Sequence, residues 1–158
     1  MHPKTRRLVC SAFLALWIGP ALAADTTPAA TPSDSLGEAR TLIAARNWSG
    51  AVQALRRVNE PRSADWNNLL GYSLRKMSPP DLDSAERHYT DALRIDPQHR
   101  GALEYSGELY LMKGDLARAE QRLTALDKAC FLPCEEFTDL KKAVQAYKAN
   151  GNRYVTGR

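Results

Sequence analysis

The sequence has few of the residues on which most catalytic and metal-binding sites depend. Its 158 residues include three histidines and three cysteines. Neither His88 nor His99 has a second histidine or a cysteine at a spacing typical of a metal site. No G-x-S-x-G nucleophile motif, phosphate-binding glycine loop or dinucleotide fingerprint occurs. We therefore predict a protein that is not an enzyme and needs no cofactor and no metal.

The composition excludes several other classes of protein. Hydrophobic residues make up 44% of the chain and charged residues 25%, which are ordinary values for a globular domain. Collagen, a wholly disordered chain and a multi-span membrane protein are excluded. Glu104 and Glu108 are spaced i, i+4 on a predicted helix and could form a paired acid site. No apolar pocket is evident around them, so a solvated helix face is the favoured interpretation.

Residues 1–23 have the pattern of a secretory signal peptide. Basic residues precede an apolar segment at residues 8–18, and an Ala-Leu-Ala sequence ends at Ala23. We expect cleavage after Ala23 or Ala24 and a periplasmic protein. The alternative is an uncleaved anchor in the inner membrane, which the short apolar stretch and its Gly-Pro interruption disfavour.

Removal of residues 1–23 also changes the electrostatic argument. This segment holds three of the 22 lysines and arginines and none of the 18 acidic residues, so its loss lowers the formal net charge from +4 to +1. Bulk charge then gives no reason to expect a nucleic acid as partner, and no membrane span is expected after cleavage. Residues 24–33 are rich in Thr, Pro and Ala, which predicts a flexible linker.

A 34-residue period organises the rest of the chain. Ala51, Ala85 and Ala119 recur at this spacing. Four residues before each alanine stands a residue that is favoured as a helix N-cap: Asn47, Asp81 and Asp115. A second set of apolar residues at helical spacing precedes each cap. The pattern therefore predicts helical hairpins, in which the small alanines allow the two helices to approach closely.

These residues resemble the tetratricopeptide repeat, whose pattern is W-x2-L-G-x2-Y…A-x3-F…P. The second repeat has Leu70-Gly71-x2-Leu74 and Ala85-x3-Tyr89, and the third has Ser106-Gly107-x2-Tyr110. The first repeat is degenerate. The resemblance implies an all-α, αα-hairpin solenoid, wound as a right-handed superhelix. Its expected segments are repeats at 34–62, 63–97 and 98–131, a capping helix at 135–149 and a basic tail at 150–158.

Gly71 and Gly107 lie 36 residues apart rather than 34. We therefore predict two extra residues in the turn at 77–80, as a local insertion that preserves the phase of the helices.

The resemblance further implies a concave groove that binds a protein or peptide segment. The polar positions expected to face this groove are Arg40, Asn68, Tyr72, Arg75, Glu104 and Glu108. The expected function is that of a scaffold or adaptor of the bacterial cell envelope. Two alternatives remain open: a structural subunit of an envelope assembly, and a participant in thiol–disulfide exchange. The sequence indicates neither the partner nor the oligomeric state.

Cys130 and Cys134 are the two cysteines of the expected mature chain. An even pair in an exported protein favours a structural disulfide, which here would fasten the capping helix to the last repeat. We expect the apolar stripe of that helix to cover Leu123 and Leu126. A redox-active pair is less favoured, because the spacing is C-x3-C and no thioredoxin-like strand precedes it.

Overall fold

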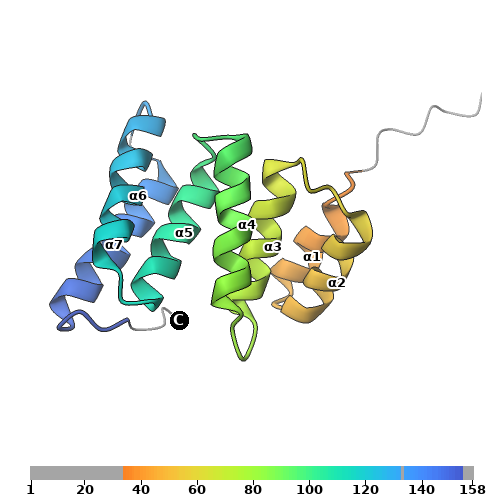
Figure 1. Cartoon of the computed structure of the whole chain (residues 1–158), viewed down its shortest axis with the longest axis horizontal. Coiled ribbons are helices and arrows are strands. Elements are labelled where there is room, and N and C mark those ends of the chain that lie inside the picture. The colour runs from red at the N-terminus through yellow and green to blue at the C-terminus, as the bar shows by residue number, and fades with distance from the viewer. Residues whose placement is uncertain (1–33, 133, 155–158) are drawn as a thin grey trace, which may run out of the picture. The chain divides into compact units, whose positions relative to one another are not determined.

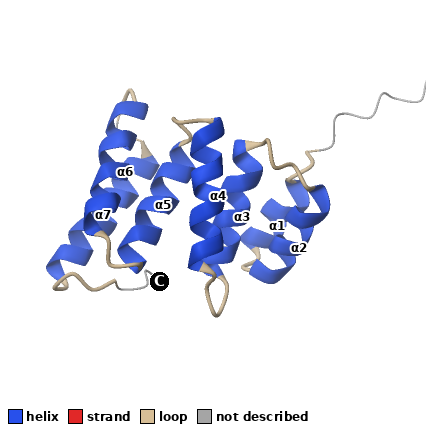
Figure 2. Cartoon of the chain, viewed as in Figure 1, coloured by secondary structure: helices blue, strands red, loops and turns tan. Residues whose placement is uncertain are grey.

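The computed structural model describes residues 34–132 and 134–154 (Figure 1). The expected signal peptide, the linker and the turn at Pro133 lie outside the described residues. The described part contains seven α-helices and no strand (Figure 2), as the all-α prediction requires. The helices are α1 (Gly37–Ala44), α2 (Trp48–Val58), α3 (Ala64–Lys76), α4 (Leu82–Ile95), α5 (Arg100–Met112), α6 (Leu116–Ala129) and α7 (Glu135–Ala149). None of these helices is long and apolar enough to cross a bilayer.

The helices pack as a solenoid of hairpins. α1 pairs with α2, α3 with α4 and α5 with α6, while α7 packs against both α5 and α6. The backbones of the odd-numbered helices also approach one another in sequence, from α1 to α3, α5 and α7, whereas those of α2, α4 and α6 do not. The odd-numbered helices therefore form the inner layer of the stack. We call their solvent-facing side the inner face.

The predicted N-caps begin the second helix of each hairpin. The side chains of Asn47, Asp81 and Asp115 accept hydrogen bonds from the backbone N–H three residues later. Each bond satisfies a donor that the first helical turn leaves free. His99 caps α5 in the same way, since its ring accepts from the backbone N–H of Ala102 at 3.1 Å. This histidine is thus a capping residue.

The second hairpin accommodates its two extra residues within the turn. In the third hairpin, the backbone N–H of Asp115 donates to the carbonyl of Tyr110, five residues earlier, at 2.8 Å. In the second, Asp81 donates to Leu74, seven residues earlier, at 3.1 Å. The same closing bond thus spans two more residues. The insertion is local, as the Gly71–Gly107 spacing predicts.

Small residues set the distance between the helices. Ala51, Ala85 and Ala119 are completely buried. A Cβ atom at Gly71 would come within 2.9 Å of the Tyr89 ring, and one at Gly107 within 2.5 Å of a Leu140 methyl group. Neither distance is compatible with an ordinary contact. The glycines of the repeat pattern are therefore needed because neighbouring side chains occupy the space of their missing Cβ.

α7 packs differently from the sequence-based expectation. Its residues Leu140, Val144 and Tyr147 are buried, and Phe137 is half-buried. The expectation placed this stripe over α6 alone. Instead α7 also packs on α5, where the Leu140 side chain fills the space above Gly107. The contact with α5 extends the inner layer by one helix.

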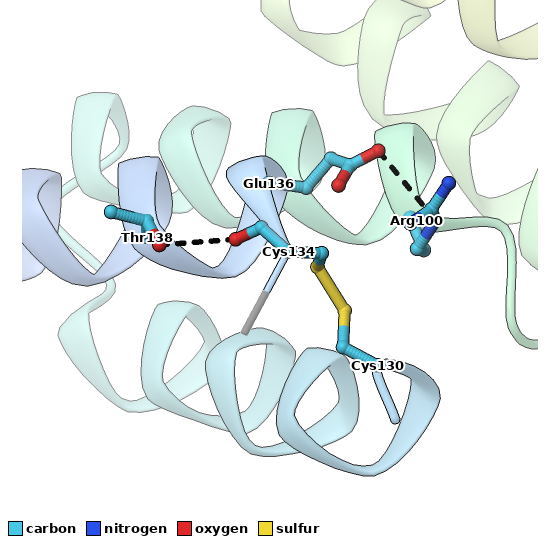
Figure 3. Close-up of a disulfide and its surroundings, with 5 residues drawn as sticks. All are labelled: Arg100, Cys130, Cys134, Glu136 and Thr138. Carbon is cyan, nitrogen blue, oxygen red and sulfur yellow. Dashed lines mark hydrogen bonds and ion pairs between the residues drawn. A yellow bond between two sulfur atoms is a disulfide. The ribbon is translucent and has the colours of Figure 1, made fainter. Parts of the chain in front are cut away.

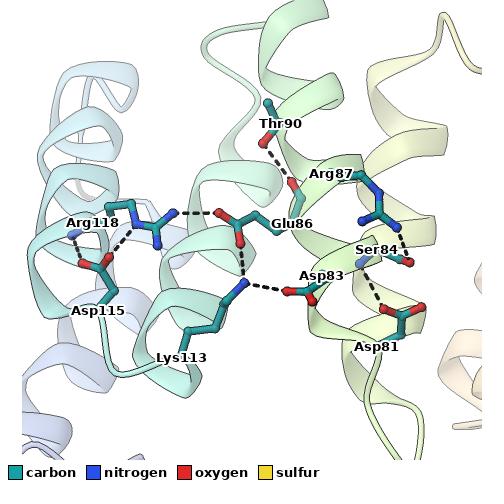
Figure 4. A network of polar contacts seen from close by, with 9 residues as sticks. All are labelled: Asp81, Asp83, Ser84, Glu86, Arg87, Thr90, Lys113, Asp115 and Arg118. Carbon is teal, nitrogen blue, oxygen red and sulfur yellow. Dashed lines mark hydrogen bonds and ion pairs between the residues drawn. The ribbon is translucent and has the colours of Figure 1, made fainter.

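An ion-pair network links α4 to the next hairpin on the outer side of the stack (Figure 4). The ammonium of Lys113 lies 2.8 Å from Asp83 and 2.6 Å from Glu86. The Arg118 guanidinium lies 2.7 Å from Glu86 and 2.6 Å from Asp115. Because most of these side chains are substantially exposed, each pair contributes little to stability. Together they fix the relative placement of two hairpins.

Candidate protein-binding face

Three aromatic side chains follow one another from α2 onto the inner layer. The rings of Trp48 and Tyr72 meet edge to face with centroids 5.8 Å apart. Tyr72 in turn lies 4.6 Å from Tyr105, in a tilted arrangement. The three residues come from α2, α3 and α5, and all are only partly buried. We call Trp48, Tyr72 and Tyr105 the aromatic row; it offers rigid, amphipathic surface of the kind found at protein interfaces.

Arg75 lies beneath the aromatic row and is held by its neighbours. The residue is 3% exposed, and its guanidinium lies 2.7 Å from the carboxylate of Glu108. It also lies over the rings of Tyr72 and Tyr105, at 5.5 and 5.6 Å from their centroids. The expectation that Arg75 faces a wet groove is wrong, because α3 and α5 enclose it. Arg75 therefore positions the aromatic row.

The surroundings of Arg75 keep it charged. Burial lowers the pKa of Arg75, but Tyr89 and the Glu108 carboxylate raise it by more, so its pKa lies above the ordinary value. Burial likewise raises the pKa of Tyr105, and the nearby Glu104 adds to this shift. Tyr105 therefore stays neutral and Arg75 stays charged at neutral pH.

Glu104 is the unusual group of this face. It is 8% exposed, and no described residue forms a hydrogen bond or ion pair with its carboxyl group. Burial, followed by the charges of Glu108, Asp139 and Glu136, raises the pKa of Glu104 to about 8. The expectation of a solvated face is therefore wrong for Glu104. No group of side chains suited to holding a metal ion occurs in the described residues.

The other predicted residues divide into two places. Asn68 is buried beside the aromatic row on α3, next to Gly101 of α5, and its Oδ1 has no hydrogen-bond partner among the described residues. Arg40 does not join this group. It is exposed on α1, where its guanidinium lies 2.6 Å from Asp34 and 3.6 Å from Asp65. Five of the six predicted positions thus lie together on α3 and α5, and Arg40 lies apart.

The described part of the C-terminal segment returns towards α5 (Figure 1). Gly151 and Asn152 adopt positive φ angles of 65° and 59°, which turn the chain back after α7. Tyr154 then packs against the core. Burial raises the pKa of Tyr154, and the Glu108 charge adds to this effect. The segment predicted as a basic tail therefore contributes an aromatic side chain beside the Arg75–Glu108 pair.

Sequence reasoning did not find Trp48, Tyr105 or Tyr154 as members of this face. Trp48 stands at the first position of α2, Tyr105 falls between the two glutamates of α5, and Tyr154 lies beyond the last helix. Trp48 recurs with the 34-residue period at the position that Leu82 and Leu116 hold, so its spacing indicated a helix start rather than a binding residue. The alternation of Tyr105 with Glu104 and Glu108 was the one available signal, since it places an aromatic ring beside two carboxylates.

The cysteines lie in the connection between α6 and α7 (Figure 3). Cys130 follows α6 and Cys134 precedes α7; the two form a close pair with their Cα atoms 5.9 Å apart. The hydroxyl of Thr138 donates to the carbonyl of Cys134 at 3.0 Å. Phe131 and Leu132, between the cysteines, are exposed by 100% and 71%. These two side chains are a second feature that the sequence pattern did not reveal.

The comparison with known protein families agrees with the hairpin packing. Residues 80–129 match the tetratricopeptide repeat family model. The match covers α4, α5 and α6 and supports the resemblance noted from the sequence. Tetratricopeptide repeats generally mediate protein–protein interactions and are typically not catalytic. No curated protein matches the chain.

Proposed function

We propose that this protein is a scaffold or adaptor of the bacterial cell envelope that binds a protein segment on its inner face. The observation that carries the proposal is the aromatic row, whose three partly buried rings contact one another in turn across α2, α3 and α5. The buried Arg75–Glu108 ion pair fixes two of these rings before any partner arrives. A preformed surface loses less conformational entropy on binding.

A cross-linking pull-down from envelope extracts tests this function. Tyr72→Ala removes the central ring and is expected to abolish most partner recovery. Arg87→Ala serves as the matched control, because Arg87 lies exposed on α4 and contacts Ser84 within its own helix. Equal recovery by both variants, with unchanged melting curves, would refute the proposed binding face.

Export to the periplasm forms part of the proposal. Its support is the pattern of residues 1–23 and the close Cys130–Cys134 pair, because disulfides persist in oxidising compartments. N-terminal sequencing of the protein from its native host should begin at Ala24 or Asp25. Recovery of residues 1–20 intact in a membrane pellet would favour an inner-membrane anchor instead.

One observation favours a second candidate function, that of a structural subunit. Phe131 and Leu132 expose two large apolar side chains on the short loop between the cysteines. Such a pair can dock against another component of an assembly. Loss of assembly on Phe131→Ser, with the pull-down unaffected by Tyr72→Ala, would support this alternative over the adaptor.

A further inference from the structure

We propose that the inner face recognises a lysine or arginine side chain of the partner segment, with Glu104 as the counter-ion and Tyr105 beside it. The inference rests on the proposed function and specifies its partner. It follows from the arrangement of charges around Glu104, from a second unsatisfied acceptor nearby, and from the aromatic rings that border both.

The carboxyl group of Glu104 lacks a cation although cations are close. Arg75 on α3 is committed to Glu108 at 2.7 Å. On α7, Glu136 lies 3.6 Å from Arg100 and Asp139 lies 3.2 Å from Lys142. These neighbouring carboxylates thus have partners among the described residues, whereas Glu104 has none there. Glu104 is therefore the carboxyl group of this part of the inner face that has no counter-ion among the described residues.

A buried carboxylate without a partner is costly, so a ligand that supplies the missing cation is favoured. The charged and titratable groups that interact with Glu104 are Glu108 and Tyr105 on its own helix, Glu136 and Asp139 on α7, and Arg75 and Tyr72 on α3. The three nearest carboxylates disfavour a second anion at this point. Charge complementarity therefore selects a cationic side chain and rejects an acidic one.

Asn68 provides an independent observation. Its Oδ1 is buried and has no donor among the described residues. Asn68 contacts the backbone region of Gly101, which lies three residues before Glu104 on α5 and so on the same side of that helix. Asn68, with its unpartnered Oδ1, thus lies beside the α5 turn that precedes Glu104. An ammonium or guanidinium group carries several N–H donors and can satisfy such acceptors.

The aromatic rings suit the same ligand. Tyr72 and Tyr105 are partly buried, and both interact with the charge of Glu104. Arg75 already lies over both rings on their buried side, at 5.5 and 5.6 Å from the centroids. Cations are attracted to the faces of aromatic rings, where the ring quadrupole is negative. The apolar stem of a lysine or arginine would pack on these rings while its charged end reaches Glu104.

A proton is released when such a side chain binds. The pKa of Glu104 is about 8 in the free protein, so the group is mostly protonated at pH 6. A bound cation favours the ionised form and lowers that pKa. Affinity is therefore greatest above pH 8 and decreases as the pH falls, by up to about tenfold per pH unit. We expect at least tenfold weaker binding at pH 6 than at pH 8.

Four capped, fluorescein-labelled nine-residue peptide pools test the inference. They are degenerate except at the central position, which is Lys, Arg, norleucine or Glu. At pH 8 the Lys and Arg pools should bind the full mature chain at least tenfold more tightly than the norleucine pool, and the Glu pool least. Glu104→Gln should reduce the affinity of the protein for the Lys pool to its affinity for the norleucine pool. Glu60→Gln removes a carboxylate in the loop between α2 and α3, and it should leave the affinity for all four pools unchanged.

The outcomes separate this inference from the proposed function. Binding that Tyr72→Ala abolishes, but that shows no preference for Lys or Arg, refutes the cation site and leaves the binding face intact. Absence of binding by every pool refutes both. A second measurement guards against a misfolded variant: the carboxyl ¹³C signal of Glu104 should titrate at least one pH unit lower with the Lys pool. An unchanged titration with the bound pool would overturn the inference.

Discussion

The guanidinium of Arg75 and the carboxylate of Glu108 form an ion pair of 2.7 Å between α3 and α5, with the Arg75 side chain 2% exposed. The pair joins the second repeat to the third directly beneath the aromatic row. A buried arginine held in this way restricts the rings above it. The surface that a partner would contact thus depends on an interaction that the partner does not touch.

Arg75→Met should destabilise the protein by on the order of 2 kcal/mol. Removing one partner of a buried pair leaves the other charge without compensation, although Glu108, 24% exposed on its side chain, retains some solvation. Urea unfolding measures the loss. The double variant Arg75→Met with Glu108→Met should recover much of it, because apolar side chains can replace a buried pair. Additive losses in the double variant would argue against the pairing.

Gly107→Ala should cost about 1–3 kcal/mol, because the new Cβ would overlap the buried Leu140 side chain. Leu140→Val removes the overlapping methyl groups, so the combination should be more stable than the sum of the two single losses. Thermal melts and urea unfolding provide the comparison. Gly37→Ala is the matched control, since its Cβ would meet Asp34 at an ordinary 3.5 Å. Equal effects of the two alanine variants would contradict the packing of α7 on α5.

Glu104→Gln should stabilise the protein increasingly as the pH rises from 5 to 8. The pKa of Glu104 is raised from 4.5 to about 8 in the folded protein. Between pH 5 and 8 Glu104 keeps its proton in the folded wild type but has lost it in the unfolded chain. The stability of the wild type therefore decreases as the pH rises. The difference between variant and wild type should grow by up to about 1.4 kcal/mol per pH unit. A flat profile for Glu104→Gln would contradict the burial of this carboxyl group.

Cys130 and Cys134 should be oxidised to each other in the exported protein. Replacing both by Ser should lower stability by about 2 kcal/mol or less, because the loop that they close is short. The binding of peptide pools at the inner face should not change, since the pair lies at the end of α6, away from α3. Thiol trapping with mass spectrometry on fresh periplasm reads the oxidation state. Two free thiols there would refute the structural disulfide.

The hairpin architecture could be predicted from the sequence because its determinants are local. Ala85 and Asp81 recur with a 34-residue period, and a cap followed by a 3.6-residue apolar stripe specifies where a helix begins and which side it buries. The 36-residue spacing of Gly71 and Gly107 likewise located the insertion in the second turn. These features depend on residues within one or two helical turns of each other.

Tertiary packing alone decided the character of the inner face. Nothing local distinguishes Arg75 and Glu104 from solvated helix residues; both are buried because α3, α5 and α7 approach closely through glycine positions. Burial, and the neighbours that burial brings, then set their charge states. Tyr154 reaches Arg75 only because the chain turns back after α7. Periodicity specifies which side of a helix is buried, whereas the pairing of charges across helices depends on side chains distant in the sequence.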